Sequence, residues 1–230
     1  MPYLFYDYYY LILVVPAMII ALIAQIKVKS TYNKFAKVGN SRSVTGAYAA
    51  QAVLTHYGIR DVRIEQVSGK LSDHYDPKAK VIRLSSEVYS GSSIAAVGIA
   101  CHEAGHAAQH AENYAPIKFR NTLVPVCNIG STLGVPLALL GYFLGFEPLI
   151  TIGLALYALI TVFHLVTLPV EFNASRRAIK VIDETNLLYD DEMNGAKKVL
   201  KAAAMTYVAS LIVSLANLLR LVLRFNNRRN

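Results

Sequence analysis

One short segment of the chain has the residue types and the spacing of a metal-binding catalytic motif. His102 and His106 are four residues apart, and Glu103 directly follows the first histidine. On a helix, residues four apart lie about 6 Å apart along the axis and on one face, so both imidazoles can bind one ion. Glu103 lies on the adjoining flank, where a carboxylate can take a proton from a metal-activated water. The pattern predicts one zinc ion per chain with Glu103 as general base, although manganese and cobalt accept the same ligands.

A catalytic zinc usually has three protein ligands, so a third must come from elsewhere in the chain. His110 continues the four-residue spacing, but it lies about 12 Å along the helix axis from His102, too far to share an ion. Glu112 stands where another motif of this kind has a third histidine. Glu171 is the best candidate, because it follows an apolar segment that ends on the same side of the membrane as the motif; the other interpretation is a charge at the membrane interface. Two further acidic residues remain as alternative ligands, Asp183 and Glu184.

Long apolar segments make up much of the chain. Of 230 residues, 54% are hydrophobic and 17% are charged, and the mean hydropathy is +0.37, which is typical of an integral membrane protein. We predict membrane helices at 8–26, 121–146 and 148–170, and a fourth segment at 202–223 that either crosses the bilayer or lies in its interface, because its polar residues form one stripe. The net charge of +8 comes from Lys and Arg beside these segments, so we expect the lipid bilayer as partner and no nucleic acid.

The second and third predicted spans are separated by only a short turn, so they form a hairpin whose outer ends lie on one side of the bilayer. Residues 27–120 and 171–201 therefore share that side. Most Lys and Arg residues near the ends of the spans lie there too, and the positive-inside rule places this side in the cytoplasm. The exceptions are four arginines of the C-terminal tail: Arg220, Arg224, Arg228 and Arg229.

The sequence thus predicts a mainly α-helical integral membrane protein with three to four membrane helices and a small cytoplasmic α+β domain. That domain, 27–120, has two or three short strands and the motif helix at 94–112, and the segment 171–201 supplies the third ligand. A strand at 81–84 is the predicted place where an extended peptide adds to the sheet. His74 and Tyr75, in a polar turn, are candidate donors to the oxyanion of a transition state.

Four segments carry a resemblance to a known family: the motif helix, Ser72-Asp73-His74-Tyr75-Asp76-Pro77, Tyr114-Ala115-Pro116, and the segment from Glu171 to Ala178. In these segments the chain resembles the bacterial membrane-bound neutral zinc metallopeptidases, the YugP-type family. The resemblance implies a glutamate-type (gluzincin) HExxH peptidase, a multi-pass protein of the bacterial cell membrane that hydrolyses peptide bonds in peptides or membrane proteins. Similar membrane peptidases carry an aspartate four residues after the ligand glutamate, and it orients a zinc histidine. This chain has Ser175 there, so Ser175, Asn173 or another group must orient the ring.

Two other functions compete with this one. In a non-catalytic zinc-binding scaffold or adaptor the metal would be structural, but such a site has no need for the base Glu103. An intramembrane protease needs the motif on a spanning helix, and the apolar stretch before His102, from Ile94 to Cys101, is too short to cross. The sequence leaves the oligomeric state open.

Overall fold

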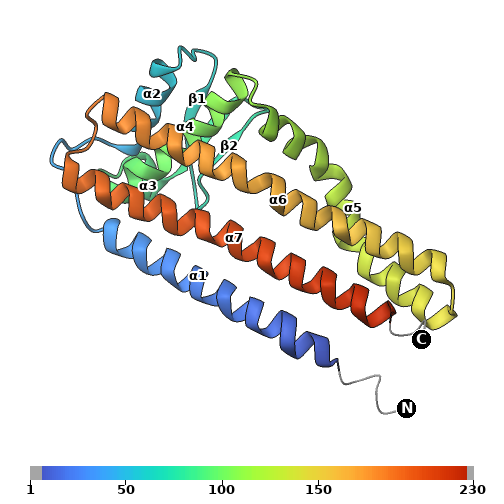
Figure 1. The fold of residues 1–230 in the computed structure, drawn as a ribbon. Coiled ribbons are helices and arrows are strands. Elements are labelled where there is room, and N and C mark those ends of the chain that lie inside the picture. Colours follow the sequence, from blue (N-terminus) through green and yellow to red (C-terminus); the bar gives the residue numbers. More distant parts are fainter. Residues whose placement is uncertain (1–6, 227–230) are drawn as a thin grey trace. The chain divides into compact units, whose positions relative to one another are not determined.

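The computed structural model describes residues 7–226, and this part of the chain is mainly helical (Figure 1). A π-helical turn η2 (Tyr10–Val14) continues into α1 (Val15–Phe35). The other helices are α2 (Gly46–His56), α3 (Ser86–Tyr89), α4 (Ile94–Ala111), α5 (Ala115–Leu144), α6 (Glu147–Glu184) and α7 (Asp190–Asn226), and the strands are β1 (Arg63–Val67), β2 (His74–Asp76) and β3 (Val81–Ser85). Among the described residues, four helices are long and apolar enough to cross a membrane: Tyr10–Phe35, α5, α6 and α7.

The chain forms two compact units. The bundle unit comprises the described parts of Met1–Gln25, Phe119–Leu168 and Thr206–Asn230. The sheet unit comprises Ile26–Lys118 and Pro169–Met205, and it holds the motif helix α4 together with Glu171. Every residue singled out above for metal binding or catalysis therefore belongs to the sheet unit.

The predicted hairpin between the second and third spans is present in the bundle unit. Helix α5 ends at Leu144, Gly145 adopts a positive φ of 68°, and α6 begins at Glu147. The two helices are in close contact along their length: a Cβ on Gly130 would lie 2.6 Å from the carbonyl oxygen of Leu156. Small residues permit this close approach of backbones, which stabilises helix pairs in membranes.

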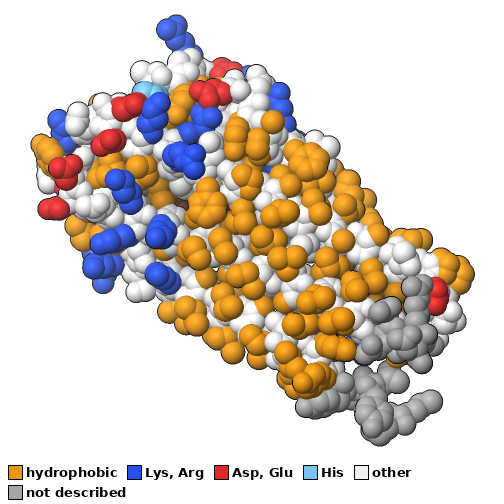
Figure 2. All heavy atoms as spheres, viewed as in Figure 1, with side chains coloured by type: hydrophobic (Ala, Val, Ile, Leu, Met, Phe, Trp, Pro, Cys, Tyr) orange, Lys and Arg blue, Asp and Glu red, His pale blue; other side chains and the backbone are white. Residues whose placement is uncertain are grey.

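The surface of the bundle unit is apolar. On the face drawn in Figure 2, hydrophobic side chains cover its helices almost without interruption. Large side chains that are about half exposed include Ile19, Ile20, Leu22, Ile23, Phe143 and Leu144. A contiguous exposed apolar surface of this kind is expected where helices face lipid.

Two of the tail arginines that are exceptions to the charge rule have a common partner in the bundle unit. The side chains of Arg220 and Arg224 each donate to Oδ2 of Asp7 at 2.7 Å, and Arg220 also lies over the ring of Tyr10. This pairing lowers the cost of placing the two charges at the end of an apolar helix. Arg228 and Arg229 lie outside the described residues.

The sheet unit contains a three-stranded sheet in the order β1-β3-β2. Strand β3 pairs in parallel with β1 and antiparallel with β2. The prediction that an extended peptide adds to residues 81–84 is therefore wrong, because these residues form the central strand and their backbone groups already pair on both sides. The burial of β3 is that of a central strand: Val81, Ile82 and Leu84 are fully buried.

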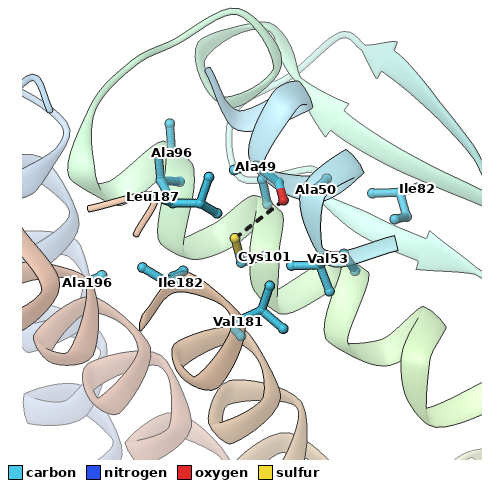
Figure 3. Close-up of a cluster of buried hydrophobic side chains, with 14 of the residues drawn as sticks. Ala49, Ala50, Val53, Ile82, Ala96, Cys101, Val181, Ile182, Leu187 and Ala196 are labelled. Carbon is cyan, nitrogen blue, oxygen red and sulfur yellow. Dashed lines mark hydrogen bonds between the residues drawn. The ribbon is translucent and has the colours of Figure 1, made fainter. Parts of the chain in front are cut away.

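The core of the sheet unit packs α2, β3 and α4 against the parts of α6 and α7 that belong to this unit. Figure 3 shows Cys101 of α4 among Ala49 and Val53 of α2 and Val181 and Ile182 of α6. Its thiol is fully buried and donates to the carbonyl oxygen of Ala49 at 3.7 Å. Burial raises the pKa of this thiol, so Cys101 acts as a small core residue.

Candidate metal centre

Helix α4 carries both motif histidines on one face. It begins after Ser93, whose hydroxyl accepts a hydrogen bond from the backbone N–H of Ala96. It ends at Ala111, one residue before the predicted end. The rings of His102 and His106 lie 4.7 Å apart between centroids, so both side chains project in the same direction.

Helix α6 brings Glu171 to these histidines. The helix runs without a break from Glu147 to Glu184, so the predicted third span and the first part of the predicted ligand segment 171–201 are one element. Gly105 lets α4 approach it: a Cβ at this position would lie 2.7 Å from the carbonyl oxygen of Ala174. The HExxH motif leaves positions 104 and 105 free to vary, but in this fold a glycine at 105 allows the close packing of α4 against α6.

The side chains of His102, His106 and Glu171 lie close enough together to hold one metal ion. Oε2 of Glu171 lies 3.3 Å from Nε2 of His102 and 3.7 Å from Nε2 of His106, and within the described part of the chain these ligand atoms lie within 4.8 Å of one another. Ligands bound at about 2.0–2.2 Å to a tetrahedral ion are about 3.3–3.6 Å apart. Two imidazoles and a carboxylate are also the donor set of many catalytic zinc sites. The residues present fit zinc.

The surroundings of the three ligands are dry. Glu171 is only 3% exposed and His106 only 9%, although ionisable side chains are seldom buried unless they are paired or bind metal. Burial alone would lower the pKa of His106, but the carboxylate of Glu171 at 3.7 Å and the charge of Glu103 outweigh it and raise that pKa. The carboxylates therefore make this a place that attracts a cation.

Each histidine has a second partner at its Nδ1 atom, on the side away from Glu171. Nδ1 of His102 lies 3.1 Å from Oγ of Ser175, so Ser175 takes the place of the aspartate found in similar peptidases. Nδ1 of His106 lies 3.0 Å from Oε1 of Gln109. Contacts of this kind fix the ring orientation and leave Nε2 available as the ligand atom. Asn173 contacts no ligand histidine in these hydrogen bonds, but it does contact Gln109.

The other candidate ligands from the sequence lie elsewhere. The ring of His110 packs against Tyr75 at 5.6 Å between centroids. Glu184 forms ion pairs with His56 and Lys180. Within the described residues, the cluster of His, Cys, Asp and Glu that could hold a metal does not include His110, Asp183 or Glu184.

His74 is not placed with the metal ligands. It pairs with Arg83 in the sheet register, and Nδ1 of its exposed ring hydrogen-bonds the carbonyl oxygen of Ser72 at 2.7 Å. The next residue, Tyr75, lies on the opposite face of the strand, where it contacts α4 at His110. Of the two predicted oxyanion donors, only Tyr75 thus faces the motif helix.

Sequence reasoning missed Gln109 and did not recognise the role of Arg177. Gln109 is completely buried, which is exceptional for this residue type, and its side chain contacts both α4 and α6. The available signal was its spacing of three residues from His106, which places both side chains on one face of the helix. Arg177 is four residues after Asn173, a spacing that also places two side chains on one face of a helix, and its Nε donates to Oδ1 of Asn173 at 2.7 Å.

Comparisons with known proteins agree with this donor set. A family model described as "Putative neutral zinc metallopeptidase" matches residues 10–226. A relative from Bacillus subtilis (strain 168), named "Putative membrane protease YugP", is 45% identical over 221 residues, which are 96% of this chain and 98% of the relative. No solved structure gives a significant match.

Proposed function

The chain belongs to the family of neutral zinc metallopeptidases, and from this premise we propose that it is a zinc-dependent integral-membrane endopeptidase with its active site at the cytoplasmic surface of the bacterial cell membrane. The observation that carries the proposal is the convergence of His102, His106 and Glu171, from two helices that are far apart in the sequence. The relative that covers nearly the whole chain is itself named as a membrane protease.

The residues of α4 and α6 divide the chemistry between binding and proton transfer. His102, His106 and Glu171 would hold the ion, and a bound zinc supplies a Lewis acid that polarises the scissile carbonyl and makes a water more acidic. Glu103 is half-buried and is one residue along α4 from His102. Its carboxylate accepts the proton of the attacking water and then passes it to the leaving amine. Tyr75 is the candidate donor to the developing oxyanion.

The location at the membrane surface is supported by the helix that carries Glu171. Helix α6 contains an apolar segment long enough to span a bilayer, and Glu171 stands after that segment in the same helix. The sheet unit also carries the basic residues that are expected on the cytoplasmic side, including Lys27, Lys29, Lys34, Lys37, Lys197, Lys198 and Lys201. A peptide substrate or a membrane protein with an extended cytoplasmic segment fits this position.

The experiment that tests the proposal measures zinc content and proteolysis in the same samples. We expect full-length wild-type protein, purified in detergent, to bind about one zinc per chain and to cleave fluorescein-labelled casein. Glu103→Gln should keep the zinc and lose about 10²- to 10⁴-fold in rate, because the base is gone and the ligands remain. Glu65→Gln, the same substitution on strand β1, is the matched control and should change neither quantity.

Each other outcome contradicts the proposal. Zinc binding without cleavage of casein by the wild type, or undiminished cleavage by Glu103→Gln, would favour the non-catalytic scaffold or a different base. Wild-type protein that binds no zinc would exclude a zinc peptidase altogether.

A further inference from the structure

The amide of Gln109 has only one orientation that satisfies its neighbours. Its nitrogen lies 2.8 Å from the carbonyl oxygen of Val170 and 2.9 Å from Oδ1 of Asn173, and both of these atoms accept hydrogen bonds. The nitrogen must therefore donate to them, and Oε1 must face Nδ1 of His106 at 3.0 Å. Because Gln109 is fully buried, reversing the amide would leave its polar atoms without water as a substitute.

The orientation of Asn173 is determined in turn by Arg177. The Nε atom of Arg177 lies 2.7 Å from Oδ1 of Asn173. A guanidinium group can only donate hydrogen bonds, and it keeps its proton in proteins. The atom of Asn173 that it contacts must therefore be the oxygen, and this oxygen also accepts from Gln109.

Arg177 is itself held on three sides. Its Nη1 atom forms a 2.6 Å ion pair with Glu112, the C-cap residue of α4. The guanidinium also lies over the rings of Tyr57 and Tyr114, at 5.4 Å and 5.9 Å from their centroids. Its side chain is only 15% exposed. These contacts fix the direction in which Nε donates.

From these contacts we infer that Arg177, acting through Asn173 and together with the carbonyl oxygen of Val170, fixes the amide of Gln109 and thereby the tautomer of His106, which holds its Nε2 atom free to bind the metal. Each hydrogen bond in this series has a defined donor and acceptor. Arg177 and Gln109 both donate to Oδ1 of Asn173, and Nδ1–H of His106 donates to Oε1 of Gln109. The neutral ring of His106 then carries its lone pair on Nε2, the atom that lies 3.7 Å from Glu171. The inference rests on the proposed function, since it assumes that this centre binds zinc.

The second histidine lacks such a directed chain. Nδ1 of His102 contacts the hydroxyl of Ser175, and a hydroxyl can donate as well as accept. Ser175 therefore orients the ring without selecting a tautomer by itself. The two histidines differ in how strongly the protein prepares them for metal, and Arg177 is a positioning residue for His106 alone.

The test compares zinc affinity, measured by competition with a chromophoric chelator, in full-length variants purified in detergent. Gln109→Met keeps the side-chain volume but removes the acceptor, and we expect zinc affinity to fall by about 10- to 100-fold. Arg177→Met should lower it by about threefold or more, because the amide of Asn173 is then free to reverse. The matched control is Arg176→Met, the same change at the exposed neighbouring position, which should leave the affinity unchanged.

Two further variants separate positioning from general loss of structure. Asn173→Asp keeps an acceptor for both Arg177 and Gln109, so its zinc affinity should stay close to that of the wild type, whereas Asn173→Leu should behave like Gln109→Met. In the double variant of Gln109→Met with Arg177→Met, the arginine change should add nothing further to the loss of affinity, because its path to His106 is already cut.

The inference is overturned if wild type binds zinc but Arg177→Met has the affinity of Arg176→Met. It is also overturned if the effect of Arg177→Met persists undiminished in the Gln109→Met background, or if Asn173→Asp is as weak as Asn173→Leu. Absence of zinc binding by the wild type is a different result, since it contradicts the proposed function itself.

Discussion

Replacing Gly105 with alanine tests whether the spacing of α4 and α6 sets the metal centre. The added Cβ would lie 2.7 Å from the carbonyl oxygen of Ala174, whereas ordinary contact begins at 3.4 Å. The helices must therefore move apart by about 0.7 Å unless other adjustments absorb the overlap, and metal–ligand distances tolerate only about 0.2 Å. Because His102 and Glu171 lie on opposite sides of this contact, we expect zinc affinity to fall by at least about tenfold, or about 1.4 kcal/mol.

The effect on stability follows from two opposing contributions. Alanine is a better helix former than glycine by about 1 kcal/mol, and overpacking costs about 1–3 kcal/mol. Gly105→Ala should thus range from neutral to about 2 kcal/mol less stable. Gly98→Ala, on the same helix, is the matched control: its Cβ would lie 3.6 Å from the nearest atom, the Cβ of Ala196, which is ordinary contact. We expect it to gain up to about 1 kcal/mol and to bind zinc normally.

The assay combines chelator competition for zinc with thermal unfolding of the metal-free proteins in one detergent. Measuring the metal-free state separates loss of the fold from loss of the ligand geometry. If Gly105→Ala binds zinc as tightly as Gly98→Ala, the close approach of the two helices does not determine the positions of the ligands, and the reasoning is refuted.

Three further predictions concern the surroundings of the centre and the bundle unit. Ser175→Ala should weaken zinc binding by about tenfold because the ring of His102 loses its partner, whereas Ser175→Asp should retain zinc binding. Equal zinc affinities of the wild type and Ser175→Ala in the chelator assay would contradict the role of Ser175 in orienting His102. Zinc affinity should already decline as the pH falls towards 6.5, because the raised pKa of His106 keeps its imidazole protonated, and unable to bind metal, at higher pH than usual. If zinc affinity measured at several pH values declines only below 6.5, the pKa of His106 is not raised. Asp7→Asn should lower the unfolding temperature in detergent, since two arginines of α7 lose their common partner, and an unchanged temperature would mean that these ion pairs contribute nothing.

The fold was predictable where a local pattern was sufficient. The apolar segments predict three membrane helices and a fourth helix that either crosses the bilayer or lies in its interface. The structure has four helices long and apolar enough to cross among its described residues. The sequence predicts the motif helix at 94–112, and α4 begins at Ile94 and ends at Ala111, one residue before the predicted end. The order of the strands was not predictable, because the apolar residues of β3 indicate a buried strand but not which strands pair with it. Strand order depends on pairing between residues distant in the sequence, and no local pattern records it.

The sequence by itself determined the chemistry of the centre. The spacing of His102 and His106 places two imidazoles on one face of any helix, and Glu103, the next residue, lies on the adjoining flank as the predicted general base. The sequence also favoured Glu171 as the third ligand but kept Asp183 and Glu184 as alternatives. Only the tertiary structure places Glu171, 65 residues after His106 along the chain, beside the two histidines. It also decided that Gln109 and Ser175 orient the rings. Helical periodicity fixes neighbours within a few residues, whereas contacts between helices depend on how closely their backbones pack.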